Sequence, residues 1–303
     1  MNTQNTKPLR AALFGNAIFS AISAVVFLLF SQNVGSLVGL SNHFILVGIG
    51  VGLGIFSADL FHQASRRRIQ TWRALYASLG DALWVVGAVV LLLWFPETLN
   101  EQGRFLLIAV SVIVGLFGSL QFWGAGEAHR LTGSKFYRHC VAVRVPVSTA
   151  MMWDVVSDLS GISKYFPSLR SSIIRDHLEP QVGATRQCED MSGKKWAEKC
   201  TKFEAGKRLE MEFLCQEDGF PYPASEMIGG WELVEISDKA TEVHIWWELR
   251  PTPSFMAPLI MPLLGLKADM DFPPLVFRMA GCEDIPVNTK SLIRRMLLPT
   301  PSC

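Results

Sequence analysis

The chain has 303 residues, of which half are hydrophobic, and its 28 Lys and Arg nearly balance its 27 Asp and Glu. A formal net charge of +1 leaves no basic excess to neutralise a phosphate backbone, so no nucleic-acid partner is expected. Charged residues make up only about 9 % of residues 1–128 but about 25 % of residues 129–303. This split excludes a single soluble domain and predicts a membrane domain followed by a soluble one.

Four long apolar runs dominate residues 1–128. Each has about 18–22 residues, the length with which an α-helix crosses the hydrocarbon core of a bilayer. The runs are Ala11–Phe30, Phe44–Phe61, Ala74–Phe95 and Phe105–Trp123. Residues 31–43 hold no Lys or Arg, whereas residues 66–73 hold four Arg, and basic loops stay in the cytoplasm. We therefore expect a four-helix, multi-pass integral membrane protein with both termini cytoplasmic, in a bacterial inner membrane.

Each apolar run contains one amide or carboxyl side chain: Asn16, Asp59, Asp81 and Gln121. Counted from the flanking basic residues, all four lie at a similar depth, roughly 9–14 Å inside the cytoplasmic boundary. A carboxylate at that depth is costly unless it is protonated or hydrogen-bonded, so we expect one polar cluster on the axis of the bundle. Two interpretations stay open, a hydrogen-bonded knot that joins the helices and a site for a proton, an ion or a lipid headgroup.

The periodicity changes after a hydrophilic connector at residues 129–138. Alternating apolar and polar residues predict seven strands, separated by turn residues. The strands are Cys140–Val145, Ser171–Asp176, Ala184–Met191, Trp196–Phe203, Arg208–Cys215, Met227–Val234 and Glu242–Arg250. Between the first two lies a helical segment with Ser148 as its expected N-cap. This order predicts an α+β domain.

The stretch VRVPVSTAMMWDVVSDLSGISKYFP at residues 143–167 resembles the opening of the START / Bet v 1-like superfamily, the SRPBCC or polyketide cyclase/dehydrase and lipid transport group. VGATRQC (182–188), WAEKCTKFEAGKRLEMEF (196–213) and GGWELVEISDKATEVHIWWEL (229–249) continue the resemblance. It implies a helix-grip domain over residues 139–285, with a curved antiparallel sheet around a C-terminal helix and an apolar cavity between them. Residues 286–303 would form a tail. The sequence departs from the family in five helix-disrupting residues, Pro258, Pro262, Gly265, Pro273 and Pro274, which predict a short or kinked C-terminal helix.

Each predicted strand has one apolar face, as a half-buried antiparallel sheet requires. The side chains that would line the cavity are Trp196, Glu198, Cys200, Met211, Phe213, Met227, Trp231, Ile245 and Trp247, with Tyr165 at its mouth. A solid core is the alternative for these positions. Glu198 is the charged exception on this face. It either orients a ligand or transfers a proton, or it forms a salt bridge with Arg186 on the neighbouring strand.

Three functions are compatible with these features. The first is membrane-tethered binding or transfer of a lipid or other hydrophobic small molecule. The second is a polyketide cyclase/dehydratase-like enzyme, a lyase or isomerase that would use Glu198, Arg186 and Tyr165. The third is a small four-helix transporter or sensor that the soluble domain regulates. The sequence has no phosphate-binding glycine loop, nucleophilic serine motif or zinc-ligand spacing, so neither cofactor nor metal is expected. Ligand identity, direction of transfer and oligomeric state stay open.

Overall fold

The computed structural model describes residues 5–176 and 179–282. The chain divides between Ala128 and His129 into two compact units, here called the helical unit and the C-terminal unit. The expected tail at residues 286–303 lies outside the described residues.

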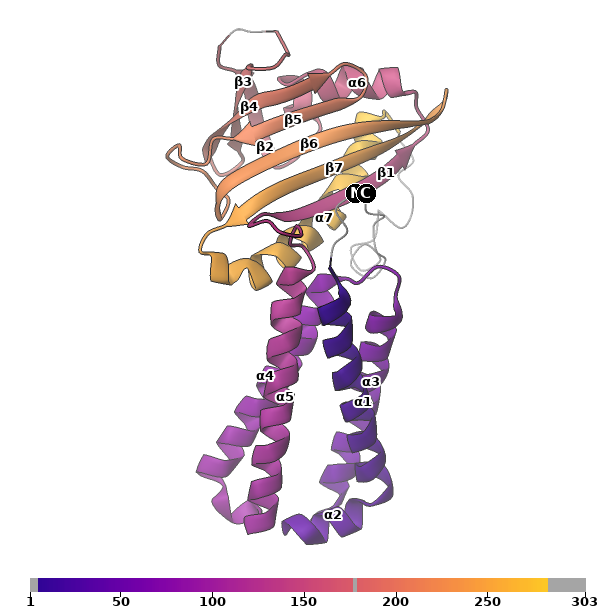
Figure 1. Cartoon of the computed structure of the whole chain (residues 1–303), viewed down its shortest axis with the longest axis vertical. Helices are drawn as coiled ribbons and strands as arrows, with labels where there is room; N and C mark the ends of the chain where they lie inside the picture. The colour runs from indigo at the N-terminus through magenta and orange to yellow at the C-terminus, as the bar shows by residue number, and fades with distance from the viewer. Residues whose placement is uncertain (1–4, 177–178, 283–303) are drawn as a thin grey trace. The chain divides into compact units, whose positions relative to one another are not determined.

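The helical unit contains four long helices, in agreement with the four apolar runs (Figure 1). They are α1 (Lys7–Leu29), α3 (Phe44–Ser65), α4 (Thr71–Trp94) and α5 (Glu101–Glu127). All four are long and apolar enough to cross a membrane. The first connection is not a plain loop, because it contains a short helix, α2 (Ser31–Val38), that ends at Gly39 with a left-handed φ of 80°. A single 3-10 turn, Pro96–Thr98, precedes α5.

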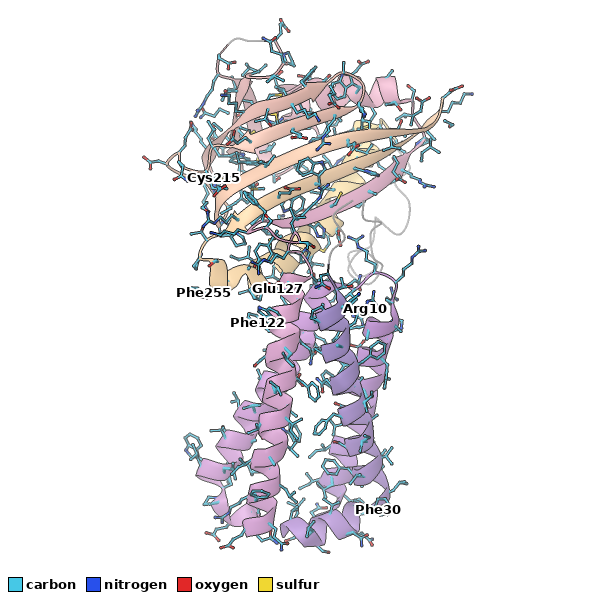
Figure 2. All side chains as sticks on the ribbon, viewed as in Figure 1. Arg10, Phe30, Phe122, Glu127, Cys215 and Phe255 are labelled. Carbon is cyan, nitrogen blue, oxygen red and sulfur yellow. The ribbon has the colours of Figure 1, made fainter. Side chains whose placement is uncertain are left out.

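Small residues let these helices approach one another closely. A Cβ atom at Gly124 would lie 3.1 Å from the backbone of Leu9, and one at Gly118 would lie 2.9 Å from the Cβ of Asp81. The outward faces carry exposed apolar side chains, including Phe30 and Phe122 (Figure 2). Exposed apolar surface on this scale is unfavourable in water and suits a lipid environment.

The C-terminal unit is built on one seven-stranded antiparallel sheet, with all seven predicted strands present (Figure 1). Its spatial order is β1–β7–β6–β5–β4–β3–β2. The bounds are β1 (Tyr137–Val145), β2 (Leu169–Ile174), β3 (Thr185–Asp190), β4 (Lys195–Glu204), β5 (Arg208–Phe213), β6 (Ala224–Ser237) and β7 (Ala240–Pro251). Strands β2 to β7 form an antiparallel meander in chain order, and the last strand, β7, also pairs with the first, β1.

Two helices cover one face of this sheet. The short helix α6 (Thr149–Ser157) begins as predicted, because the Ser148 hydroxyl accepts a hydrogen bond from the Met151 amide. A 3-10 turn, Gly161–Lys164, follows it, and another, Ser254–Met256, leads into α7 (Ala257–Met279). The curved sheet with a long C-terminal helix against it is a helix-grip fold (Figure 1).

Of the two expectations for the C-terminal helix, short or kinked, the short helix is wrong. Helix α7 runs for 23 residues through Pro262, Pro273 and Pro274, while Pro258 sits in its first turn, where the missing amide donor costs nothing. Its buried side chains pack against the sheet, and tertiary packing of an apolar face contributes more to helix stability than intrinsic propensity does.

Candidate functional site

The strand register places the predicted cavity-lining residues on one face of the sheet. Met211 lies opposite Cys200, and Phe213 lies opposite both Glu198 and Met227. Across the next strands, Trp231 is opposite Ile245 and Trp247 is opposite Gly229. This common face, called the inner face below, is the one that α6 and α7 cover.

Side chains from these helices pack directly on the inner face. Met152 of α6 and Met261 and Met279 of α7 are at most 2 % exposed and belong to the same buried cluster as the strand residues. One shallow pocket, with a volume of about 410 Å³, lies in the helical unit beside Leu37 and Phe105. An apolar cavity between the sheet and α7 therefore stays a prediction.

An ion pair interrupts the apolar inner face. Arg186 of β3 lies directly opposite Glu198 of β4, and both are at least nine-tenths buried. The Nε and Nη2 atoms of Arg186 donate hydrogen bonds of 2.9 and 2.6 Å to Glu198 Oε2. Trp196 Nε1 donates a 2.7 Å hydrogen bond to Glu198 Oε1. Glu198 thus lies on the inner face and also forms the salt bridge with Arg186, so the two features that the sequence suggested are both present.

A buried thiol, Cys188, and a partly buried phenol, Tyr222, lie close to this ion pair. The Cys188 thiol lies 3.8 Å from Glu198 Oε1 and 3.9 Å from the hydroxyl of Ser172. Burial, followed by the Glu198 carboxylate, raises the pKa of Cys188 to about 12. The same two causes, in the same order, raise the pKa of Tyr222. Both groups are therefore neutral at physiological pH and do not compete with Glu198 for Arg186.

Aromatic side chains gather at this end of the inner face. The Tyr222 ring lies 5.9 Å from Trp196, 6.2 Å from Phe213 and 5.6 Å from Phe220, measured between ring centroids. Phe213, Phe220 and Tyr222 are only partly buried. Sequence reasoning missed Phe220 and Tyr222, because the segment 214–223 has no strand periodicity. The motif FPYP was the available signal, since it places two rings at alternate positions between prolines.

Tyr165 does not join Arg186 and Glu198. It follows the 3-10 turn Gly161–Lys164 and packs against the apolar core. Its hydroxyl makes no hydrogen bond to either residue within the described part of the chain. The structure thus brings together two of the three side chains that the enzyme interpretation named.

A second polar group, which sequence reasoning missed, links β1 to α7. His139 Nε2 lies 2.9 Å from Asp269 Oδ1, and the buried ring of His129 lies 5.3 Å from that of His139. A Cβ atom at Gly265 would lie 2.9 Å from His139 Nδ1, so the ring is enclosed by α7. Because 130 positions separate His139 from Asp269, no spacing in the sequence could have revealed the pair.

Three of the four polar residues expected in the membrane helices meet. Asn16 Nδ2 and Gln121 Nε2 donate hydrogen bonds of 2.9 and 3.0 Å to Asp81 Oδ2. Asp59 instead pairs with Arg73 and accepts a hydrogen bond from Gln63. Among the described residues, no group of three or more His, Cys, Asp or Glu is arranged to hold a metal ion.

Residues 138–271 match the sequence model of the family described as polyketide cyclase / dehydrase and lipid transport. The matched segment begins at the second residue of β1 and ends within α7, so it covers nearly all of the sheet and most of the helix that packs on it. This segment belongs to that family. The name family domain is used for it below.

Solved structures with some similarity include an aromatase/cyclase from a Streptomyces species, which is 12 % identical, covers 48 % of this chain and 94 % of its own, and has a TM-score of 0.41. A protein from Thermobifida fusca is 19 % identical over 50 % of this chain and 98 % of its own, with a TM-score of 0.41. Norcoclaurine synthase from Thalictrum flavum is 14 % identical over 48 % and 85 %, with a TM-score of 0.39. No curated protein matches the chain.

Proposed function

We propose that the family domain binds a lipid or other hydrophobic small molecule between its sheet and α7, while the helical unit tethers it to a membrane. The observation that carries this proposal is the buried ion pair of Arg186 and Glu198 on an otherwise apolar inner face. A buried ion pair seldom stabilises a fold more than well-packed apolar side chains of the same volume would. Its presence at this position therefore favours a role in recognition.

Arg186 has donor capacity left for a ligand. Nε and Nη2 bond to Glu198, whereas Nη1 has no hydrogen-bond partner among the residues that the structure describes. Glu198 holds the guanidinium in place and keeps its pKa raised although burial lowers it. A molecule with an apolar body and one oxygen-bearing group fits this arrangement, because its oxygen would accept from Nη1 beside the aromatic rings of Phe213 and Tyr222.

The packing of α6 and α7 is compatible with entry of such a molecule. Met152, Met261 and Met279 are the buried methionines on the covering helices, and Met211 and Met227 face them from the sheet. Methionine has three rotatable bonds and adapts to new neighbours, so these side chains are the ones expected to move aside for a ligand.

A short connector would keep the family domain beside the membrane. Nine residues separate the end of α5 at Glu127 from the start of β1 at Tyr137, which is at most about 30 Å of extended chain. A ligand dissolved in the bilayer is then at a high effective concentration near the domain and needs no long aqueous path.

Extraction of bound lipid tests the proposal. The full chain is purified in a mild detergent, extracted with organic solvent and examined by mass spectrometry. Variants carrying both Arg186→Met and Glu198→Leu, which remove the two charges together, are compared with Glu212→Gln on the exposed opposite face. The native chain and Glu212→Gln are expected to retain one apolar molecule per chain, and the double variant is expected to lose most of it.

Two results would contradict the proposal. One is the absence of any co-purifying molecule from the native chain, and the other is equal retention by the double variant. A native chain that arrives empty and converts a cyclisable polyketide substrate would support the enzyme alternative. That alternative requires Glu198 and Arg186 to act on substrate without a hydrogen bond from Tyr165.

A further inference from the structure

Asp81 lies where three of the long helices meet. It belongs to α4 and accepts hydrogen bonds at Oδ2 from Asn16 of α1 and Gln121 of α5. Asp81 is 4 % exposed, and Asn16 and Gln121 are still more deeply buried. Asp81 is ten residues into α4, about 15 Å along its axis, and therefore well inside an apolar stretch.

The basic residues near this cluster have other partners. Arg73 of α4 pairs with Asp59 of α3, and Arg10 of α1 donates to the carbonyls of Ala64 and Arg66 at the end of α3. Arg104 of α5 bonds to carbonyls near the opposite end of the helices. Within the described residues, Asp81 therefore makes no ion pair.

The remaining titratable groups on these helices do not bond to Asp81 either. Lys7 lies on the first turn of α1, His62 lies on the last turn of α3, and Glu101 and Glu127 lie at the two ends of α5. Tyr76 of α4 is 58 % exposed. A carboxylate at Asp81 would consequently be buried with two amide donors and no counter-charge, which is an unfavourable state in a low-dielectric interior.

Two oxygen atoms in the cluster lack a donor. Gln121 Oε1 is buried without a hydrogen-bond partner, although Gln121 Nε2 is bonded to Asp81. Among the described residues, Asp81 Oδ1 also receives no hydrogen bond, because both amide donors reach Oδ2. One hydrogen atom between these two side chains would give both oxygens a partner.

We propose that Asp81 is a proton-binding site in the helical unit, and that its bound proton sits on Oδ1 and is donated to Gln121 Oε1. The Asp81 carboxylate takes the proton from a hydronium ion and a water molecule is released, so that charge is balanced. The acid and the amide then form a cyclic pair with two hydrogen bonds, O–H to Oε1 and Nε2–H to Oδ2. The inference rests on the membrane location in the proposed function, and it does not depend on the ligand of the family domain.

Close packing around Asp81 supports this pair. Gly118 of α5 leaves no room for a side chain, since its Cβ would lie 2.9 Å from Asp81 Cβ and 3.5 Å from Oδ2. Ser20 donates to Asn16 Oδ1 and so fixes the Asn16 amide with its nitrogen toward Asp81. These contacts hold the side chains around Asp81 in place, so that the charge state of Asp81 is the property that can change.

Infrared spectroscopy of the full chain in lipid nanodiscs tests the proposal. The native protein at neutral pH is expected to show the C=O stretch of a protonated carboxyl group, shifted in heavy water and missing in Asp81→Asn. Asp59→Asn is the matched control, because it removes the carboxyl group that is paired with Arg73 and should leave the band unchanged. Gln121→Leu should keep the band but move it to higher frequency, since the acid loses its acceptor.

Absence of the band from the native protein, or its persistence in Asp81→Asn, would overturn the proposal. So would a native protein without the band whose unfolding temperature rises with sodium but not with choline, because that result identifies a bound cation. If Asp81→Asn does not fold, the frequency shift in Gln121→Leu decides the question. Resistance of the native chain to carbonate extraction is measured in parallel and tests the membrane location separately.

Discussion

Glu198 illustrates how one residue acquires its role from its neighbours. On β4 it stands between Trp196 and Cys200 on a face that is otherwise apolar, and it holds Arg186 and the Trp196 indole through its two oxygens. Both carboxylate oxygens of Glu198 therefore accept hydrogen bonds, whereas Nη1 of Arg186 has no partner among the described residues. Removal of one member of such a pair strongly destabilises the fold, whereas replacement of both members by apolar side chains of similar volume often does not.

Removal of Glu198 alone should therefore destabilise the C-terminal unit strongly. Glu198→Ala is expected to lower the free energy of unfolding by about 3–5 kcal/mol, because Arg186 stays buried without its partner. The double variant Arg186→Met with Glu198→Leu should lie within about 1 kcal/mol of the native chain or above it. Thermal loss of the β-sheet amide I band measures both, and equal destabilisation by the two variants would contradict the argument.

Cys188 should be chemically inert in the folded protein. Its pKa of about 12 leaves very little thiolate at pH 8, so alkylation by iodoacetamide is expected to be at least about a hundredfold slower than in the urea-unfolded chain. Because the folded pKa lies above the unfolded one, this thiol contributes stability below about pH 9 that is lost progressively as the pH rises. Mass spectrometry of the labelled peptide gives the rate, and equal rates in folded and unfolded chains would refute the prediction.

At the scale of elements, α7 depends on one small residue. Gly265 allows the helix to lie against the rings of His139 and His129, and Asp269, four residues further on, bonds to His139. The helix and β1 are thus joined by contact and by a hydrogen bond at the same level. This junction helps to hold α7 against the sheet although the helix contains three internal prolines.

A methyl group at Gly265 should weaken this junction. Gly265→Ala places a Cβ 2.9 Å from His139 and is expected to cost about 1–3 kcal/mol of stability, although alanine is the better helix former. Lys267→Ala, on the exposed side of the same helix, is the control and should change stability by less than about 0.5 kcal/mol. Thermal unfolding of the C-terminal unit compares the two, and a stabilising effect of Gly265→Ala would show that α7 does not press on the histidines.

At the scale of the molecule, the nine residues between α5 and β1 connect the helical unit to the C-terminal unit. Gly133 has a φ of 73° and no neighbour within 4 Å of a Cβ position, so a protease recognition sequence inserted there should be tolerated. Cleavage is expected in inside-out membrane vesicles and not in right-side-out ones, because the proposed orientation puts the connector in the cytoplasm. The helical fragment should then stay in the membrane after carbonate treatment. Cleavage from the outer side would reverse the proposed topology.

Much of the architecture follows from patterns that are local in the sequence. Apolar runs of membrane-crossing length predict the four long helices, and strict alternation predicts the seven strands and the face to which each side chain belongs. Alternation also places Glu198 inward, because a residue two positions from Trp196 shares its face.

Contacts between distant segments were decided only by the tertiary structure. His139 and Asp269 meet because α7 packs along β1. Asp59 is not part of the expected polar cluster, because it pairs with Arg73. Helix α7 is continuous because its packing against the sheet outweighs the effect of its prolines. Periodicity records which side of an element is buried, but it carries no information about which other element covers that side. The partners of buried polar groups therefore depend on how the elements pack.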